Sequence, residues 1–407
     1  MDQRAGIPIY RSRAVQLFAL MAVAASLRPA LTSLPPQIQS IRSDLGLSLG
    51  AISLLTAIPL LCFGAAAPLG ISPVARTRSP EVVIFFFLAI LTLASGIRVF
   101  SGWPLLYFGT IVTGIAIAAL NVIVPVVIKR DFPKKITIIM PIYTSVLAIS
   151  STISAALSVP ISNATTHNWR GGIGFFALPG FVALALWAPL MYHRRHDVLP
   201  KFIEHGRISR SLRRDPTAWA VTLYFGIQSA NFYSIVAWLP KTFIDVGYSP
   251  TRAGEMLAIT TAISIPASLL LPLSIGRGLN QRPMVILTAS VSLLGFLGMS
   301  IAPTSAPLAW VLLIGVGQSS FPASLVMMTL RARTSDETAP LSSMTQGYGY
   351  LIAAVGPVLI GLANQHSGGW TLPYALLAVA VGFQFVFGMK AGLPRIGEVD
   401  HREVSNV

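Results

Sequence analysis

Long apolar stretches alternate with short polar gaps along the whole chain, a pattern that predicts helices crossing a membrane. Windows of about 20 apolar residues, the length needed to cross a bilayer, occur twelve times. The expected spans are residues 14–34, 48–71, 81–100, 104–128, 136–161, 170–192, 217–239, 251–275, 283–302, 307–330, 338–363 and 370–389. Backbone groups find no water in lipid, and these runs are too long for barrel strands, so we expect each span to be a helix.

The longest polar segment lies between the sixth and seventh spans and divides the chain in two. The predicted parts are an N-terminal six-helix bundle (1–193), a basic cytoplasmic linker (194–216), a C-terminal six-helix bundle (217–389) and a cytoplasmic tail (390–407). The halves also resemble each other, because the segment Asp44-Leu45-Gly46-Leu47-Ser48 recurs 201 residues later as Asp245-Val246-Gly247-Tyr248-Ser249. Parallel repeats of this kind place a substrate site near the middle of the membrane, between the halves.

Composition and charge support a polytopic membrane protein. The sequence is 54% hydrophobic and 11% charged, which a soluble domain of this length would not show. The net charge of +15 could suggest nucleic acid as a partner, but the basic residues gather in alternate gaps and so mark one face of a membrane. This distribution predicts that both termini are cytoplasmic. The single cysteine, Cys62, excludes an intramolecular disulfide and a cysteine metal cluster, and we expect no cofactor or metal.

One arginine lies deep inside the first predicted span. Arg28 falls in the run from Ala14 to Leu34, which contains no other charge. A guanidinium at that depth costs roughly 2.5 to 3.5 kcal/mol on insertion scales and normally faces a cavity or a partner. Because no partner carboxylate is evident in the hydrophobic segments, we hypothesise that Arg28 binds a negatively charged ligand. The competing interpretation is structural, with Arg28 bound to helix-end carbonyls or reaching outward. Arg98, near the end of the third span, is expected to reach the outer membrane surface.

Other polar side chains in the spans are candidates for the same cavity. They are Thr32, one turn from Arg28 on the same face, with Asn121, Tyr224, Gln228, Asn231, Gln346 and Tyr350. Fixed donors around one guanidinium suit a small planar anion, because arginine presents several N–H groups in one plane. The competing interpretation for these residues is hydrogen bonding between helices.

Short motifs in both halves resemble those of a known family. They are Arg28-Pro29 with Thr32-Ser33, Pro125 with Val127-Ile128-Lys129-Arg130 and Phe132, Tyr224-Phe225-Gly226, Ala237-Trp238-Leu239-Pro240, and Gln346-Gly347 with Gly349. The chain thus resembles a major facilitator superfamily transporter, and more narrowly the bacterial cyanate permease family, which also includes a nitroimidazole exporter. The resemblance implies an all-α membrane protein with twelve transmembrane helices in two six-helix bundles, located as a monomer in the inner membrane.

The loop between the second and third spans departs from the superfamily pattern. That loop usually carries a glycine, an aspartate and a basic pair, whereas residues 70–80 read GISPVARTRSP and contain no aspartate. The usual charge relay at the inward gate is therefore not possible. We expect Arg76 and Arg78 to take part in gating instead, against helix ends or lipid phosphates.

The sequence as a whole predicts a transporter rather than an enzyme. We expect alternating-access transport of a small anion or weak acid such as cyanate, with Arg28 in the central cavity. All fourteen acidic residues fall in predicted loops, tails or span ends, so uniport, exchange and substrate-linked proton transport stay open. The alternative is an exporter of small neutral or drug-like compounds such as nitroimidazoles, and a further alternative is a membrane sensor that does not transport. The expected partners are a small molecule and the lipid bilayer, not nucleic acid.

Overall fold

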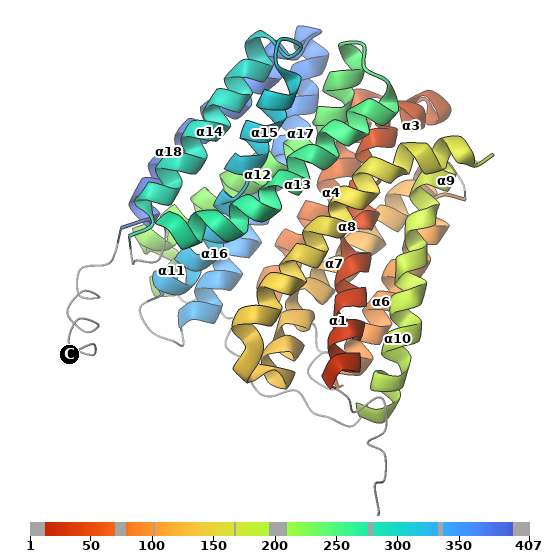
Figure 1. Ribbon diagram of the computed structural model, residues 1–407, viewed down its shortest axis with the longest axis vertical. Coiled ribbons are helices and arrows are strands. Elements are labelled where there is room, and N and C mark those ends of the chain that lie inside the picture. Colours follow the sequence, from red (N-terminus) through yellow and green to blue (C-terminus); the bar gives the residue numbers. More distant parts are fainter. Residues whose placement is uncertain are drawn as a thin grey trace, which may run out of the picture. The chain divides into compact units, whose positions relative to one another are not determined.

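A computed structural model of the chain describes residues 13–69, 79–100, 102–166, 168–194, 210–275, 280–332 and 337–393, and in these ranges all regular structure is helical (Figure 1). The helices of the first half are α1 (Arg13–Leu27), α2 (Pro29–Thr32), η2 (Pro35–Gln37), α3 (Ile38–Leu45), α4 (Leu49–Leu69), α6 (Pro80–Ile97), α7 (Trp103–Asp131), η3 (Pro133–Lys135), α8 (Ile136–Ala164), α9 (Trp169–Gly174), η4 (Phe175–Ala177) and α10 (Leu178–Arg194). Those of the second half are α11 (Arg210–Arg213), α12 (Pro216–Asp245), α13 (Pro250–Ile275), α14 (Arg282–Ile301), α15 (Pro307–Gly317), α16 (Ser320–Leu330), α17 (Thr338–Ser367) and α18 (Thr371–Ala391).

The lengths of these helices match the twelve expected spans. Within the described ranges, nine helical segments are long and apolar enough to cross a membrane, and the helix over Leu49–Ala65 is a shorter apolar one. The remaining two expected crossings are α12 and α13, which have 30 and 26 residues. Several crossings combine consecutive helices, such as α1, α2, η2 and α3 in the first crossing and α15 with α16 in a later one.

The chain divides into two compact units, of which the first contains residues 1–45 and 69–203. In this unit α6 packs against α7 and α10, while α1 lies beside α8 and α10 (Figure 1). Two glycines allow close helix contacts: a Cβ at Gly180 would clash with the Thr92 side chain, and one at Gly172 would clash with the carbonyl of Ser158. Small residues at such contacts are typical of helices that associate in membranes, where van der Waals packing holds the helices together.

The second unit contains residues 46–68 and 204–407. Here α12 packs against α17 and α18, and α14 lies beside α15 and α18 (Figure 1). The unit also includes α4, because the Leu351 side chain of α17 lies where a Cβ on Gly64 would be, at 2.8 Å. Gly361 of α17 likewise packs against Ser53 of α4 and against Trp238. These contacts join α4 to α17 of the second half of the chain. Division of the chain at the middle loop stays a prediction.

The internal repeat predicted from the sequence is also present in the local geometry. Gly46 and Gly247 both have positive φ angles, +63° and +98°, which favour glycine over residues with a side chain. Each is followed two residues later by a serine whose hydroxyl accepts a backbone N–H at the start of the next helix. These serines are Ser48, with the Ala51 amide at 3.2 Å, and Ser249, with the Arg252 amide at 3.3 Å.

An aspartate just before each of these turns makes the same bond in both units. The Trp169 indole donates to Asp44 at 3.0 Å, and the Trp370 indole donates to Asp245 at 3.0 Å. Both members of the first pair are separated from those of the second by 201 residues, the offset of the sequence repeat. Each aspartate also pairs with a basic side chain of its own unit, Arg170 or Lys241. In each unit, the same indole–aspartate hydrogen bond therefore connects the end of one crossing with the start of another.

Candidate functional site

The first crossing is interrupted at Arg28. Helix α1 ends at Leu27, and α2 begins at Pro29, which has no backbone N–H to continue the hydrogen-bond ladder. The Arg28 carbonyl then accepts the amides of Leu31 and Thr32 at 2.9 and 3.0 Å, so the chain resumes a helical course directly after the break. Arg28 keeps helical backbone angles, so the interruption is a proline kink at which the Ala25 carbonyl lacks the amide hydrogen that residue 29 would otherwise donate.

The Arg28 side chain is half-buried, and it lies near enough to α8 for its charge to reach a residue of that helix. Its charge acts on the phenol of Tyr143, a residue that is 4% exposed. Thr32 donates to the Arg28 carbonyl at 3.0 Å, and its hydroxyl lies 2.6 Å from that of Ser154. Arg28 thus has interactions within the protein, so the hypothesis of a ligand rests on the helix break and the surrounding hydroxyls rather than on a missing partner.

Sequence reasoning missed the residues contributed by α8. Ser151, Ser154 and Ser158 recur at helical spacing and are all buried. Ser154 meets Thr32, and the Ser158 carbonyl accepts the side-chain amide of Gln37 at 2.8 Å. The signal available in the sequence was this series of serines in the fifth span, the span that also carries Tyr143.

Asn121, the candidate from the fourth span, lies half-buried in α7. Pro125 stands four residues later in the same helix and cannot donate a hydrogen bond to the Asn121 carbonyl. Asn121 therefore combines a side-chain amide with a backbone acceptor that the helix ladder does not use. A role in substrate binding stays a prediction for this residue.

The polar stripe of α12 faces other helices of the second unit. Tyr224, Gln228 and Asn231 are all buried, and the Tyr224 hydroxyl faces Thr288 of α14 and Gln384 of α18. Asn231 donates its amide to the Gln384 side-chain oxygen at 3.2 Å. The Asn231–Gln384 bond is hydrogen bonding between helices, whereas Gln228 accepts the Ser229 hydroxyl of its own helix at 3.2 Å. A contact of the stripe with substrate stays a prediction.

The two candidates on α17 differ in their surroundings. Gln346 donates to the Ser342 hydroxyl one turn earlier, at 2.9 Å. Tyr350 lies in an aromatic cluster, where its ring packs edge-on against Phe63 of α4 at 5.4 Å and against Phe225 of α12 at 5.2 Å between ring centroids. Tyr350 thus presents an aromatic surface within the second unit, whereas Gln346 is part of a polar stretch of its own helix.

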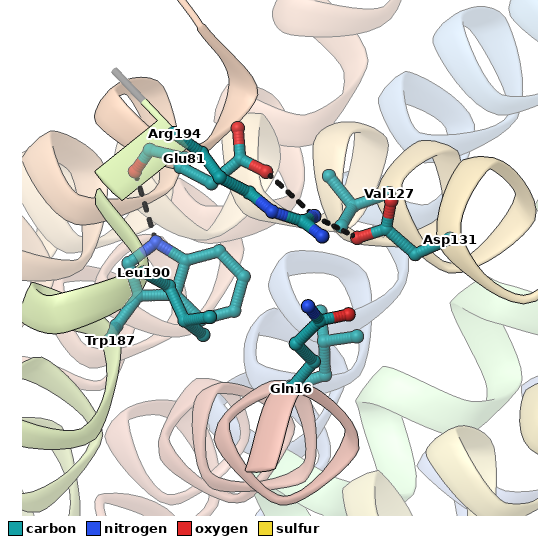
Figure 2. A pocket seen from close by; sticks show the side chains of 8 residues that line it. Gln16, Glu81, Val127, Asp131, Trp187, Leu190 and Arg194 are labelled. Atoms are coloured by element: carbon teal, nitrogen blue, oxygen red, sulfur yellow. Dashed lines mark hydrogen bonds and ion pairs between the residues drawn. The ribbon is translucent and has the colours of Figure 1, made fainter. Parts of the chain in front are cut away.

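Four charged side chains meet at one end of α6, α7 and α10, and three of them, Glu81, Asp131 and Arg194, line a small pocket (Figure 2). Figure 2 shows the Arg194 guanidinium between two carboxylates, with Nη1 at 2.7 Å from Asp131 and 3.4 Å from Glu81. Arg130 also pairs with both acids, bonding to Glu81 and, at 2.8 Å, to Asp131. The Trp187 indole donates to the Glu81 carbonyl at 2.9 Å and so fixes the first turn of α6. The cluster is neutral overall because two acids balance two bases.

This charge cluster was not predicted, although Glu81 was visible as an acidic residue at a span end. Its partners lie 49 and 113 residues further along the chain, so no local spacing connects them. Arg76 and Arg78, the residues expected in gating, lie outside the described residues. In the described ranges no group of three or more His, Cys, Asp or Glu side chains is placed to hold a metal ion.

Comparison with known proteins identifies the family of the chain. Residues 17–357 match the Major Facilitator Superfamily. The uncharacterized transporter YycB of Bacillus subtilis (strain 168) is 33% identical over 96% of this chain and 97% of its own length. The 2-nitroimidazole transporter of Escherichia coli (strain K12) is 32% identical, with 94% and 96% covered, and the cyanate transport protein CynX of the same organism is 27% identical, with 90% and 94% covered.

A solved structure shows the same fold. A bacterial homologue of the human lysosomal transporter Spinster superposes with a TM-score of 0.72 at 15% identity, covering 95% of this chain and 97% of that one. The match confirms the predicted architecture of twelve helices in two bundles, and the relatives confirm a transporter rather than an enzyme. The chain therefore belongs to the Major Facilitator Superfamily, as a multi-pass membrane transporter of the group that includes the cyanate and 2-nitroimidazole transporters.

Proposed function

We propose that this transporter moves a small anion or weak acid, such as cyanate, by alternating access, with Arg28 as its main binding residue. The observation that carries the proposal is the half-buried cation of Arg28 at the interruption of the first crossing, where its charge acts on Tyr143 and its backbone carbonyl accepts the Thr32 hydroxyl. A guanidinium presents N–H donors in one plane and binds a small carboxylate-like or linear anion with charge-assisted hydrogen bonds. The relative that transports cyanate supports this class of substrate.

The charge of such a substrate limits the direction of transport. Moving one negative charge inward against an inside-negative potential of 100 mV costs about 2.3 kcal/mol. No acidic residue lies in the middle of a predicted span to carry a compensating proton. Three modes of transport avoid this electrical cost: export of the anion, exchange for another anion such as bicarbonate, and transport of a weak acid in its neutral form.

A second candidate function is export of small neutral aromatic compounds such as nitroimidazoles. The cluster of Tyr350 with Phe63 and Phe225 favours it, because edge-on and stacked aromatic contacts suit a flat heterocycle. The relative that transports 2-nitroimidazole supports it as well. In this function Arg28 has a structural role at the helix break.

The remaining features of the proposal concern residues and membrane orientation. The protein acts as a monomer in the inner membrane, with both termini cytoplasmic and with bundles over residues 1–193 and 217–389. The supporting binding residues are Thr32, Asn121, Tyr224, Gln228, Asn231, Gln346 and Tyr350. Gating involves Arg76 and Arg78.

Counterflow in proteoliposomes tests the proposal and separates the two functions. Wild type, Arg28→Gln and Arg42→Gln are reconstituted, and counterflow of isotope-labelled cyanate is measured with and without 2-nitroimidazole as competitor. Arg42, a partly exposed residue of α3, serves as the matched control. The proposal predicts saturable cyanate counterflow that Arg28→Gln abolishes and Arg42→Gln retains. Counterflow of labelled 2-nitroimidazole that survives Arg28→Gln, without a cyanate signal, would establish the second function instead.

A further inference from the structure

Arg98 is a buried cation in the first unit that the proposed transport function does not use. It follows the last residue of α6 and is 1% exposed, although a basic residue at a span end was expected to reach the membrane surface. Its Nε and Nη2 atoms make no hydrogen bond with any residue in the described part of the chain. The reason for the burial is the close approach of α7, where a Cβ at Gly109 would clash with the Arg98 side chain and lie 3.2 Å from the Ala94 carbonyl.

Two further polar side chains belong to the same region. Helices α6 and α7 are joined by residues 98–102 only, so they run antiparallel. One turn back from Arg98 on α6 is Ser95, and one turn forward from Gly109 on α7 is Thr113, which places both at one level of the helix pair. A helical side chain leans toward the N-terminus of its helix, so the Arg98 side chain leans toward this level. The hydroxyls of Ser95 and Thr113 are also buried, and neither bonds to a described residue.

The level of Ser95 and Thr113 on the helix pair offers two hydroxyls to the Arg98 guanidinium. A guanidinium has only N–H donors, and a hydroxyl can direct its hydrogen toward an acceptor. Burial of an unpaired charge is strongly unfavourable, and an acceptor that is also negatively charged satisfies the hydrogen bonds and the charge together. The tight α6–α7 contact at Gly109 restricts the acceptor to a small one.

We propose that Arg98, Ser95 and Thr113 bind a small monovalent inorganic anion, such as chloride, between α6 and α7. The anion stabilises the helix pair and is not the transported substrate. This site is separate from the one proposed at Arg28, which lies at the α1–α2 break and faces α8. The transporter is therefore stabilised by an inorganic anion that binds apart from its substrate.

Thermal unfolding of the purified full chain tests this site. Chloride is titrated against gluconate at constant ionic strength, and the unfolding temperature is recorded for wild type, Ser95→Ala, Thr113→Ala and Arg98→Gln. Wild type is expected to show a saturable rise in unfolding temperature. Each hydroxyl variant should need about tenfold more chloride for half of the rise, since it loses one hydrogen bond to a charged group. Arg98→Gln should show no chloride dependence.

Two controls make the outcome decisive. Thr92→Ala removes another buried hydroxyl of α6, but one that bonds to the Leu88 carbonyl of its own helix at 2.7 Å, so its chloride midpoint should equal that of wild type. Arg28→Gln should keep the wild-type chloride response. The proposal is wrong if the rise is unsaturable and equal in wild type, Ser95→Ala and Thr113→Ala, because that indicates a general salt effect. Loss of the response in Arg28→Gln would place the anion at the substrate site and also overturn it.

Discussion

The charge cluster at the end of α6, α7 and α10 offers a quantitative test of how the first unit is held together. Glu81→Gln keeps the shape of the side chain and removes its charge. Breaking a fully buried ion pair by removing one partner costs about 3–5 kcal/mol. The Glu81 side chain is 2% exposed, but those of Arg130 and Arg194 are 20% and 29% exposed, and both still pair with Asp131 in the variant. We therefore expect a smaller loss of stability, about 1.5–3 kcal/mol, the range for a hydrogen bond to a charged group.

A double-mutant cycle isolates this interaction from other effects of the substitution. Unfolding by sodium dodecyl sulfate in mixed micelles is measured for wild type, Glu81→Gln, Arg194→Gln and the double variant. The exposed pair Arg252–Glu255 on α13, with a separation of 2.8 Å, provides the matched control cycle. Exposed pairs contribute about 0.2–1 kcal/mol. If the coupling energy of Glu81 with Arg194 is no larger than that of the control pair, the cluster does not stabilise the first unit.

Two further predictions concern packing and the internal repeat. Gly315→Ala should lower stability by about 1–3 kcal/mol, because its Cβ would clash with the Thr260 carbonyl on α13. A Cβ at Gly382 would have nothing within 4 Å, so Gly382→Ala should be neutral or stabilising. Unfolding of both variants checks this, and equal stability of the two variants would contradict it. Trp169→Phe and Trp370→Phe should each cost roughly 1–2 kcal/mol through loss of the indole bond to an aspartate, and clearly unequal losses in the same unfolding assay would show that the repeat is not energetically equivalent.

The helices could be predicted because their cause is local. The backbone of each apolar run must form its hydrogen bonds internally in lipid, so the position of the run in the sequence predicts the position of the helix. The ends were less predictable. The seventh span was expected over 217–239, yet α12 continues to Asp245, where Lys241 pairs with that aspartate one turn later. This polar pair lies beyond the apolar run, so the hydropathy of the sequence does not predict the last turns of the helix.

The site was predictable only where its residues are neighbours in sequence. Arg28 and Thr32 share a helix face, and their proximity follows from spacing alone. Tyr143 and Ser154 reach them from a helix more than a hundred residues later, and Glu81 likewise finds its bases on two other helices. Such partners depend on how helices pack, which no local pattern specifies. The packing of α4 with α17 is a further case of this kind.

Arg28 is the residue proposed to bind a small anion, and its affinity for one can be measured directly. The dissociation constant of labelled cyanate, measured by equilibrium binding to purified wild type and Arg28→Gln in the same detergent, tests this claim without a transport step. Loss of a charge-assisted contact worth about 1.5–3 kcal/mol corresponds to an affinity weakened about ten- to hundredfold. The dissociation constant should rise by that factor in Arg28→Gln and stay unchanged in Arg42→Gln. Saturable cyanate binding with equal affinity in wild type and Arg28→Gln would contradict it.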